Sequence, residues 1–234
     1  VQANMLRWLR SDLEAATTAP ARAARPWIVV HYHRPAYSGN YGPASPGNSS
    51  GDPYARNVFE GILYEFGVDL IFEGHVHSQE RTWPVVNNTV MNGTTDPGGN
   101  PYHEARAPVH IVSGNPSNAE GTSIFAQPPA PWSAWRSYAY GYAHLSIVNA
   151  TALYVDIIST NLGGAVVDDM WLTKTTPCTF GAACDRSGGE SATSSSSGRS
   201  SSSSSSSSSN INYKDNNNTT TTTNNNTENS KSSG

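Results

Sequence analysis

The sequence has few charges, little cysteine and no long hydrophobic run. Its 234 residues include two Cys, and charged side chains make up 14% of them, with a formal net charge of −4. This balance argues against the basic patch that nucleic-acid binding needs. No apolar run approaches the roughly 20 residues that a membrane-spanning helix needs. We therefore expect neither a nucleic-acid partner nor a transmembrane segment in this chain, and its oligomeric state stays open.

Cys178 and Cys184 are separated by five residues. In an oxidising compartment this spacing suits a small disulfide loop, whereas no further thiol or nearby histidine completes a metal site. Two free thiols are the alternative. Four Asn-x-Ser/Thr sequons in predicted loops or turns also favour a secreted, extracellular or lumenal glycoprotein. Their asparagines are Asn48, Asn87, Asn92 and Asn149.

Composition divides the chain near Pro177. All six Trp lie within the first 171 residues, among regular apolar runs that can bury a core. Beyond Asp185 the sequence is mostly Ser, Thr, Asn and Gly, and such a segment cannot offset its chain entropy by burial. We predict a folded region over 1–176 and a disordered, low-complexity tail over 177–234.

Hydrophobic periodicity predicts an α/β fold. Apolar residues at helical spacing predict helices over 2–16 and from Ala55 to Phe66, the second ended by Gly67. The second helix joins the apolar run 27–30 to the run 68–72, as in a parallel βαβ crossover. The pattern after Trp83 is typical of β structure. It predicts a hairpin with strands at 84–86 and 89–91, then strands around 108–113, 144–149, 152–159 and 165–173, with 144–149 and 152–159 antiparallel.

Both strands of the predicted crossover end in histidines. His31-Tyr32-His33 follows one apolar run and Gly74-His75-Val76-His77 follows the other. Open α/β sheets bind ligands at the carboxyl ends of their strands, and imidazole is the commonest protein ligand for mid-series metals. Gly74 lets the backbone turn tightly or approach a ligand closely. The two clusters predict two sides of one metal site, with ordinary strand histidines as the alternative.

Several segments resemble those of purple acid phosphatases, in the calcineurin-like metallophosphoesterase superfamily. Residues 30–37 (VHYHRPAY) are similar to the family's VxxH segment in its HRPxY form, and 74–82 (GHVHSQERT) to its GHxH segment. Later similar segments are 107–115, 132–138 and 140–151. The resemblance covers residues 1–175 and implies the C-terminal portion of a layered α/β/β/α metallophosphoesterase sandwich.

The resemblance implies an acid phosphatase that hydrolyses phosphate monoesters at a dinuclear metal centre. His33 and His75 match ligands of a divalent ion (Zn, Mn or Fe), and His77 matches a ligand of Fe(3+). Ions in such a pair polarise phosphoryl oxygens and generate a hydroxide nucleophile from bound water.

Three further residues are candidates to contact the substrate. Arg34 and Tyr37 follow His33 and could meet phosphate oxygens through charge-assisted hydrogen bonds, with scaffolding of the loop as an equal alternative. His31 shares strand parity with His33 and could face the pocket, although a hydrogen-bonded strand histidine is the favoured alternative. Plant-type members carry histidines in the following loop, and 38–43 contains none.

The remaining family ligands, in its DxG, GDxxY and GNH motifs, find no match in the sequence. Gly51-Asp52-Pro53-Tyr54 differs from GDxxY because its tyrosine is one position short and it follows the VxxH segment. Bridged metals also need carboxylates, and no acidic cluster with suitable spacing lies near the histidines. The chain begins at Val1 inside a predicted helix without an initiator Met or signal peptide. We expect a C-terminal fragment with weak metal binding and negligible turnover on its own.

Two other functions stay open. A metal-dependent phosphodiesterase or nucleotidase of the same superfamily would share the GHxH segment. A non-catalytic, glycosylated surface or cell-wall protein would use the Ser/Thr-rich tail as a stalk.

Overall fold

The computed structural model describes residues 2–42, 45–49, 51–94, 96, 98–117 and 119–188. The part of the predicted tail from residue 189 onward lies outside the described residues. The helices are α1 (Gln2–Ala16), α2 (Ala19–Ala24), α3 (Pro53–Glu65) and α4 (Ala182–Gly188). The strands are β1 (Val29–His31), β2 (Tyr41–Gly42), β3 (Ser45–Ser49), β4 (Leu70–Glu73), β5 (Gln79–Thr82), β6 (Val85–Val86), β7 (Thr89–Val90), β8 (Val109–Ser113), β9 (Ser133–Ser137), β10 (Gly141–Ile147), β11 (Ala152–Ser159) and β12 (Ala165–Thr173).

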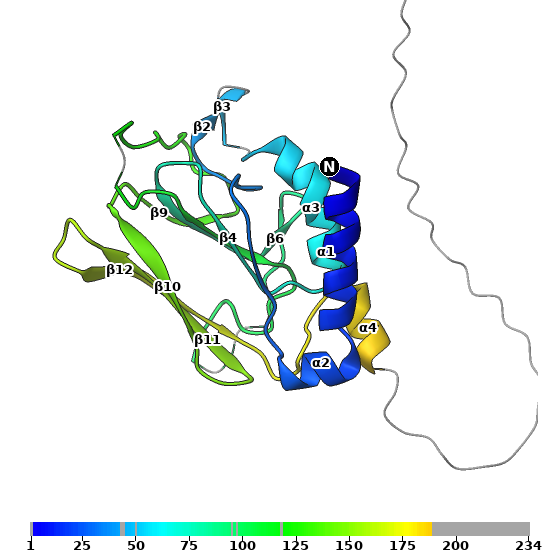
Figure 1. The fold of residues 1–234 in the computed structure, drawn as a ribbon. Coiled ribbons are helices and arrows are strands. Elements are labelled where there is room, and N and C mark those ends of the chain that lie inside the picture. Colours follow the sequence, from blue (N-terminus) through cyan, green and yellow to red (C-terminus); the bar gives the residue numbers. More distant parts are fainter. Residues whose placement is uncertain are drawn as a thin grey trace, which may run out of the picture. The chain divides into compact units, whose positions relative to one another are not determined.

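Two sheets form the framework, and the α/β prediction is confirmed (Figure 1). The larger sheet has the order β1-β4-β8-β5-β9, with β1, β4 and β8 parallel and β5 antiparallel to both of its neighbours. The smaller is the antiparallel sheet β10-β11-β12. In Figure 1 the smaller sheet lies on one side of the larger one, and α1 and α3 lie on the other. None of the helices in the described ranges has the length and apolar character to cross a bilayer.

Each face of the larger sheet buries its own apolar core. Leu70 of β4 packs with Leu153 and other residues of the smaller sheet, whereas the adjacent Ile71 packs with Leu13 of α1 and Leu63 of α3. Successive side chains of a strand point to opposite faces, so a strand that is covered on both sides reads as a continuous apolar run. This explains why 68–72 predicted its strand clearly.

Helix α3 begins and ends at residues suited to those positions. The Asp52 carboxylate accepts hydrogen bonds from the backbone N–H groups of Tyr54 and Ala55, and Pro53 occupies the first turn. Gly67 follows the helix with a φ of +61°, a left-handed conformation that glycine adopts at little cost. Asp52 is therefore a helix cap, which agrees with the rejection of 51–54 as a ligand motif.

The sequence did not predict β5 and β9. All four side chains of β5 are buried although the strand reads Gln-Glu-Arg-Thr, and most of their polar groups have partners in the fold. Arg81, for example, donates from Nε and Nη2 to Asp168 of β12 at 2.6 and 2.7 Å. A buried strand that lacks apolar alternation gives no periodic signal.

The folded region extends past the predicted boundary at residue 176. A disulfide joins Cys178 to Cys184, whose Cα atoms are 5.5 Å apart. Ala183 of α4 lies in the same core as α1 and α3. This stretch has few apolar residues, and they do not repeat at helical spacing. The disulfide loop, rather than an amphipathic helix, brings them into the core. We therefore correct the boundary to include at least α4.

Candidate metal centre

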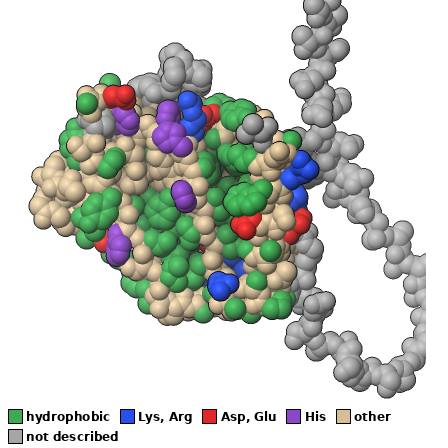
Figure 2. All heavy atoms as spheres, in the orientation of Figure 1, with side chains coloured by type: hydrophobic (Ala, Val, Ile, Leu, Met, Phe, Trp, Pro, Cys, Tyr) green, Lys and Arg blue, Asp and Glu red, His purple; other side chains and the backbone are tan. Residues whose placement is uncertain are grey.

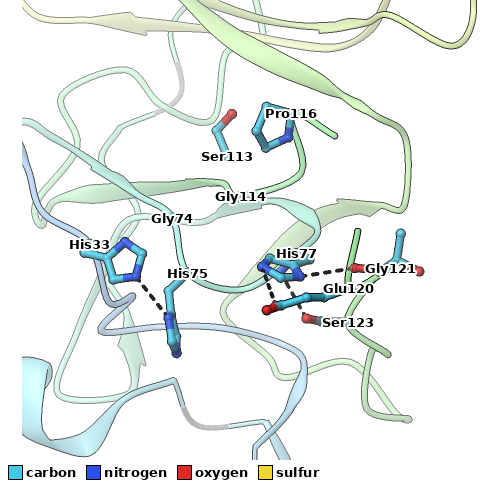
Figure 3. A pocket seen from close by; sticks show the side chains of 11 residues that line it. His33, Gly74, His75, His77, Ser113, Gly114, Pro116, Glu120, Gly121 and Ser123 are labelled. Atoms are coloured by element: carbon cyan, nitrogen blue, oxygen red, sulfur yellow. Dashed lines mark hydrogen bonds and ion pairs between the residues drawn. The ribbon is translucent and has the colours of Figure 1, made fainter. Parts of the chain in front are cut away.

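The two histidine clusters meet at the carboxyl edge of β1 and β4. The strands pair in parallel with His31 opposite Phe72, so the chain leaves both of them at the same edge. The Gly74 N–H donates to the His33 carbonyl at 3.0 Å, which continues the pairing into the loops. His33 Nε2 and His75 Nδ1 then lie 3.1 Å apart (Figure 3).

His75 has a strained backbone. Its φ is +61°, a region that non-glycine residues rarely adopt and that costs on the order of 1–3 kcal/mol. Short hydrogen bonds, Val76 N–H to the Gly74 carbonyl at 2.6 Å and Ser78 N–H to the Val76 carbonyl at 2.8 Å, fold the loop tightly. The tight turn that we expected at Gly74 has its positive φ at His75 instead. Strain of this kind is typical of functional sites.

Gly114, directly after β8, lies against the backbone of the loop that carries His75 and His77. A Cβ atom on Gly114 would lie 1.9 Å from the Val76 carbonyl oxygen, a separation that no side chain can occupy. The Gly114 N–H donates to the Ser78 carbonyl at 3.1 Å. The Ser-Gly-Asn sequence at 113–115 therefore lets the two backbones touch.

The His77 ring is held in one tautomer. Its Nδ1 lies 3.1 Å from the Gly121 carbonyl oxygen, and because a carbonyl only accepts, Nδ1 carries the proton. Nε2 is left with a free lone pair, the arrangement that a metal-binding histidine requires. The nearest acidic group to Nε2 is the exposed Glu120, whose Oε2 lies 3.7 Å away.

The three histidines line one open pocket of about 850 Å³. The pocket's other wall comes from the last residue of β8 and the segment that follows it: Ser113, Gly114, Pro116, Glu120, Gly121, Thr122 and Ser123. In Figure 2 histidine side chains gather near the upper edge of the visible face, beside basic and acidic side chains.

The geometry at His33 and His75 fits two ligands of one ion. Metal–nitrogen bonds of about 2.1 Å that meet at tetrahedral or right angles hold their nitrogens roughly 3.0–3.4 Å apart. Burial, and then the positive charge of Arg34, lower the pKa of His75, which favours the neutral imidazole that a metal binds. Within the part of the chain that the structure describes, no three His, Cys, Asp or Glu side chains converge as a metal site. The donor set is therefore one imidazole pair plus a separate imidazole.

Substrate contact and scaffolding of the loop were equal alternatives for Tyr37, and its burial favours scaffolding. Its ring is fully buried and packs edge-on against Trp132 and His110. Its hydroxyl hydrogen-bonds with Glu60 and accepts from the Asn88 N–H. Tyr37 is thus committed to the core and scaffolds the loop.

Arg34 and His31 remain accessible. The Arg34 side chain is 59% exposed and pairs with Asp52 at 3.1 Å. His31 is exposed and lines a neighbouring pocket of about 450 Å³ that it shares with His33. Of these two residues, only Arg34 is among the groups that lower the pKa of His75.

Two buried carboxylates next to the histidine loop bind backbone rather than metal. Glu73 Oε1 accepts from the Ala36 N–H at 2.8 Å and lies 3.2 Å from His110 Nδ1. Glu80 accepts from the Gly39 N–H at 2.5 Å and from the Ser133 hydroxyl at 2.6 Å. Both acids stabilise the loop that follows His33 through these hydrogen bonds.

The predicted glycosylation sites lie in varied settings. Asn87, Asn92 and Asn149 are exposed and lie in turns or loops. Asn48 lies in β3, and its side chain is outside the described part of the structure.

Models of two protein families match the chain. "Calcineurin-like phosphoesterase" matches residues 2–79, and "Iron/zinc purple acid phosphatase-like protein C" matches residues 107–169. Acid phosphatase type 7 from Homo sapiens is 39% identical over 176 residues, covering 72% of this chain and 38% of its own length. Purple acid phosphatase 18 from Arabidopsis thaliana is 36% identical over 169 residues, covering 71% of this chain and 34% of its own length. This chain therefore spans little more than a third of these relatives.

A solved structure shows the same fold. A purple acid phosphatase from yellow lupin (Lupinus luteus) seeds superposes with a TM-score of 0.57 at 22% identity, covering 67% of this chain and 27% of its own.

Replacing Gly114 by Ala should disturb the histidine loop. Because the new Cβ would overlap the Val76 carbonyl, we expect the free energy of unfolding to fall by about 3 kcal/mol and the NMR signals of His75 and His77 to shift. Gly61→Ala is the matched control, since Gly61 in α3 has open space around it. That control should raise stability by about 0.5–1 kcal/mol. Equal effects of the two substitutions in urea denaturation would contradict the close approach at Gly114.

Glu80 should make the protein less stable as pH rises towards neutrality. Burial raises the pKa of Glu80 from 4.5 to about 7, although hydrogen bonds from Gly39 and Ser133 oppose this. Between these two values the folded state binds more protons than the unfolded state, so the free energy of unfolding falls as pH rises through that window.

The Glu80→Gln variant should lack this decline, which is on the order of 3 kcal/mol. Denaturant titrations from about pH 4.5 to pH 8 measure it, with the exposed Glu14→Gln as control. Parallel pH profiles of Glu80→Gln and wild type would refute the assignment.

Proposed function

The chain belongs to the purple acid phosphatase family of calcineurin-like phosphoesterases, and we propose that its three histidines hold metal ions for the hydrolysis of phosphate monoesters. One observation carries the proposal: His33 Nε2 faces His75 Nδ1 at 3.1 Å at the carboxyl edge of two parallel strands. His77 lines the same pocket, and its Nδ1 faces the Gly121 carbonyl, which in the neutral ring leaves Nε2 as the nitrogen with a lone pair. A purely structural role for these histidines would not explain why their ring nitrogens meet beside a strained backbone.

We assign His33 and His75 to a divalent ion (Zn, Mn or Fe) and His77 to Fe(3+). The iron/zinc description of the family model that matches residues 107–169 supports this pair of metals. Such ions supply a hydroxide nucleophile and offset charge on the phosphoryl oxygens. Burial and Arg34 lower the pKa of His75, which favours the neutral imidazole that a metal binds. Arg34, at the loop beside it, offers the exposed positive charge that a phosphate dianion needs on approach.

We further propose that the carboxylate ligands of the centre come from outside residues 1–234. Glu73 and Glu80, the acids nearest the histidines in sequence, each accept a backbone N–H from the loop after β1, Glu73 through its Oε1. Glu120 is close to a single histidine only. An imidazole-only set lacks the charge needed to bridge two cations, so this chain alone should bind metal weakly and turn over negligibly.

The compartment is also part of the proposal. A disulfide at Cys178–Cys184 and three exposed sequons support a secreted or lumenal glycoprotein.

Metal binding by the chain should depend on the histidine pair. Loss of a direct ligand costs at least the roughly tenfold affinity that loss of a supporting partner costs, so His33→Ala and His75→Ala should each weaken Zn²⁺ binding by about tenfold or more. Isothermal titration calorimetry measures this. His144→Ala is the control, because His144 pairs with Asp156 on the smaller sheet. Equal affinity in all four proteins would refute the site.

In the whole protein, His77→Ala should abolish both phosphomonoesterase activity and the purple absorption, because the ferric ion loses its imidazole. Turnover of a phosphate monoester and the visible spectrum are the measurements, again with His144→Ala as control. Retention of both properties by His77→Ala would overturn the assignment. Measurable turnover by the 234-residue chain alone would contradict the external source of the carboxylates.

A further inference from the structure

The buried side chain of Asn40 lies next to the candidate metal site, and the proposed function gives Asn40 no role. It is 5% exposed and lies in the loop after β1. Its Oδ1 accepts hydrogen bonds from the hydroxyls of Ser38 at 3.0 Å and Ser78 at 2.9 Å. Its Nδ2 donates to the Ser123 carbonyl at 2.9 Å. One amide therefore joins the loop that follows His33, the residue that follows His77, and the wall of the pocket.

Ser123 in turn holds His77 on both sides. The Ser123 hydroxyl accepts from the His77 N–H at 3.0 Å, and the Ser123 N–H donates to the His77 carbonyl at 2.9 Å. Two residues before Ser123, the Gly121 carbonyl accepts from His77 Nδ1. The position of this segment therefore sets both the place of the His77 backbone and the tautomer of its ring.

The loop around Asn40 packs against the segment from Gly121 to Ala126. Asn40 forms an antiparallel bridge with Phe125, and the Ala126 N–H donates to the Gly39 carbonyl at 2.8 Å. Phe125 has one further anchor, since its N–H donates to the Tyr138 hydroxyl at 2.9 Å. Of these contacts, only the Asn40 amide reaches both the Ser123 segment and Ser78.

We infer that Asn40 is a positioning residue for His77, acting through Ser123. An amide suits this place because two hydroxyls donate to its oxygen while its nitrogen donates to a carbonyl. A carboxylate there would face the Ser123 carbonyl with no proton to share, and an alanine would leave three buried groups unpaired. Without this anchor the Gly121 carbonyl is free to leave Nδ1, and the proton can then move to Nε2, which blocks metal binding at that nitrogen. The inference rests on the proposed metal role of His77.

The test reads the His77 tautomer in the metal-free chain by long-range ¹H–¹⁵N correlation NMR at mildly alkaline pH. Wild type should show a single Nδ1–H tautomer, and Asn40→Asp and Asn40→Ala should show a mixture. Asn100→Asp is the matched control. Asn100 has a similar set of bonds, to Trp171, Thr173 and Tyr102, in a loop that holds none of the three metal-candidate histidines. It should cost stability but leave the His77 signal unchanged.

Each outcome decides the inference. A single unchanged tautomer in the folded Asn40 variants, or a mixture already present in wild type, overturns it. If both Asn40 variants fail to fold by circular dichroism, Ser78→Ala serves as the second variant, because it removes a hydroxyl that holds the Asn40 amide in place, and it should produce the same kind of mixture. In the whole protein Asn40→Asp should weaken metal binding by about 10- to 100-fold, as expected for a lost supporting partner. Two results together would separate the two proposals. If the wild-type whole protein binds no metal while the Asn40 variants still shift the His77 tautomer, the proposed function is refuted and the positioning role of Asn40 stands.

Discussion

The Asp69 carboxylate sets the register in which β1 and β4 pair, and the site at the other end of these strands depends on that register. Asp69 Oδ2 accepts from the Ile28 N–H at 2.8 Å, and the Asp69 N–H donates back to the Ile28 carbonyl at 3.0 Å. Buried Arg22 and Lys174 neutralise the carboxylate at 3.0 and 2.7 Å. A slip of one residue would send every side chain to the opposite face. His33 would then no longer meet His75, so a charge cluster far along the strands helps to fix the proposed ligand pair.

Burial decides which acids near the histidines are structural. Glu73 and Glu80 flank the GHxH segment in sequence and resemble ligand candidates for that reason. In the fold each carboxylate accepts a backbone N–H from the loop after β1, from Ala36 and Gly39 respectively. Leaving such an N–H unpaired in the interior would cost about as much as the hydrogen bond itself. The two acids therefore hold one histidine loop against the other, and each spends at least one carboxylate oxygen on that structural role.

Local patterns predicted most of the framework. Helices α1 and α3, the parallel crossover, and strands β11 and β12 follow from apolar periodicity and caps, which depend on near neighbours in sequence. Strand β5 was not predicted because its side chains are polar, and those with partners find them in distant residues, such as Asp168 for Arg81. The predicted strand ends placed the histidine clusters correctly. No sequence signal predicted the positive φ of His75 or the hydrogen-bond partners of the Tyr37 hydroxyl. Those features arise from contacts across the chain.

The same division explains why the sequence located the histidines but not the geometry in which they are held. Gly114 is required only because the Val76 carbonyl lies against it, and the His77 tautomer follows from a carbonyl 44 residues away. The His33–His75 contact adds a last constraint. At 3.1 Å the two ring nitrogens are held together by one shared proton, since two lone pairs at that distance would repel. In the proposed site an ion would take the place of this proton, which would pass to the other nitrogen of the same neutral ring. The fold has therefore already met the entropic cost of bringing the two ligands together.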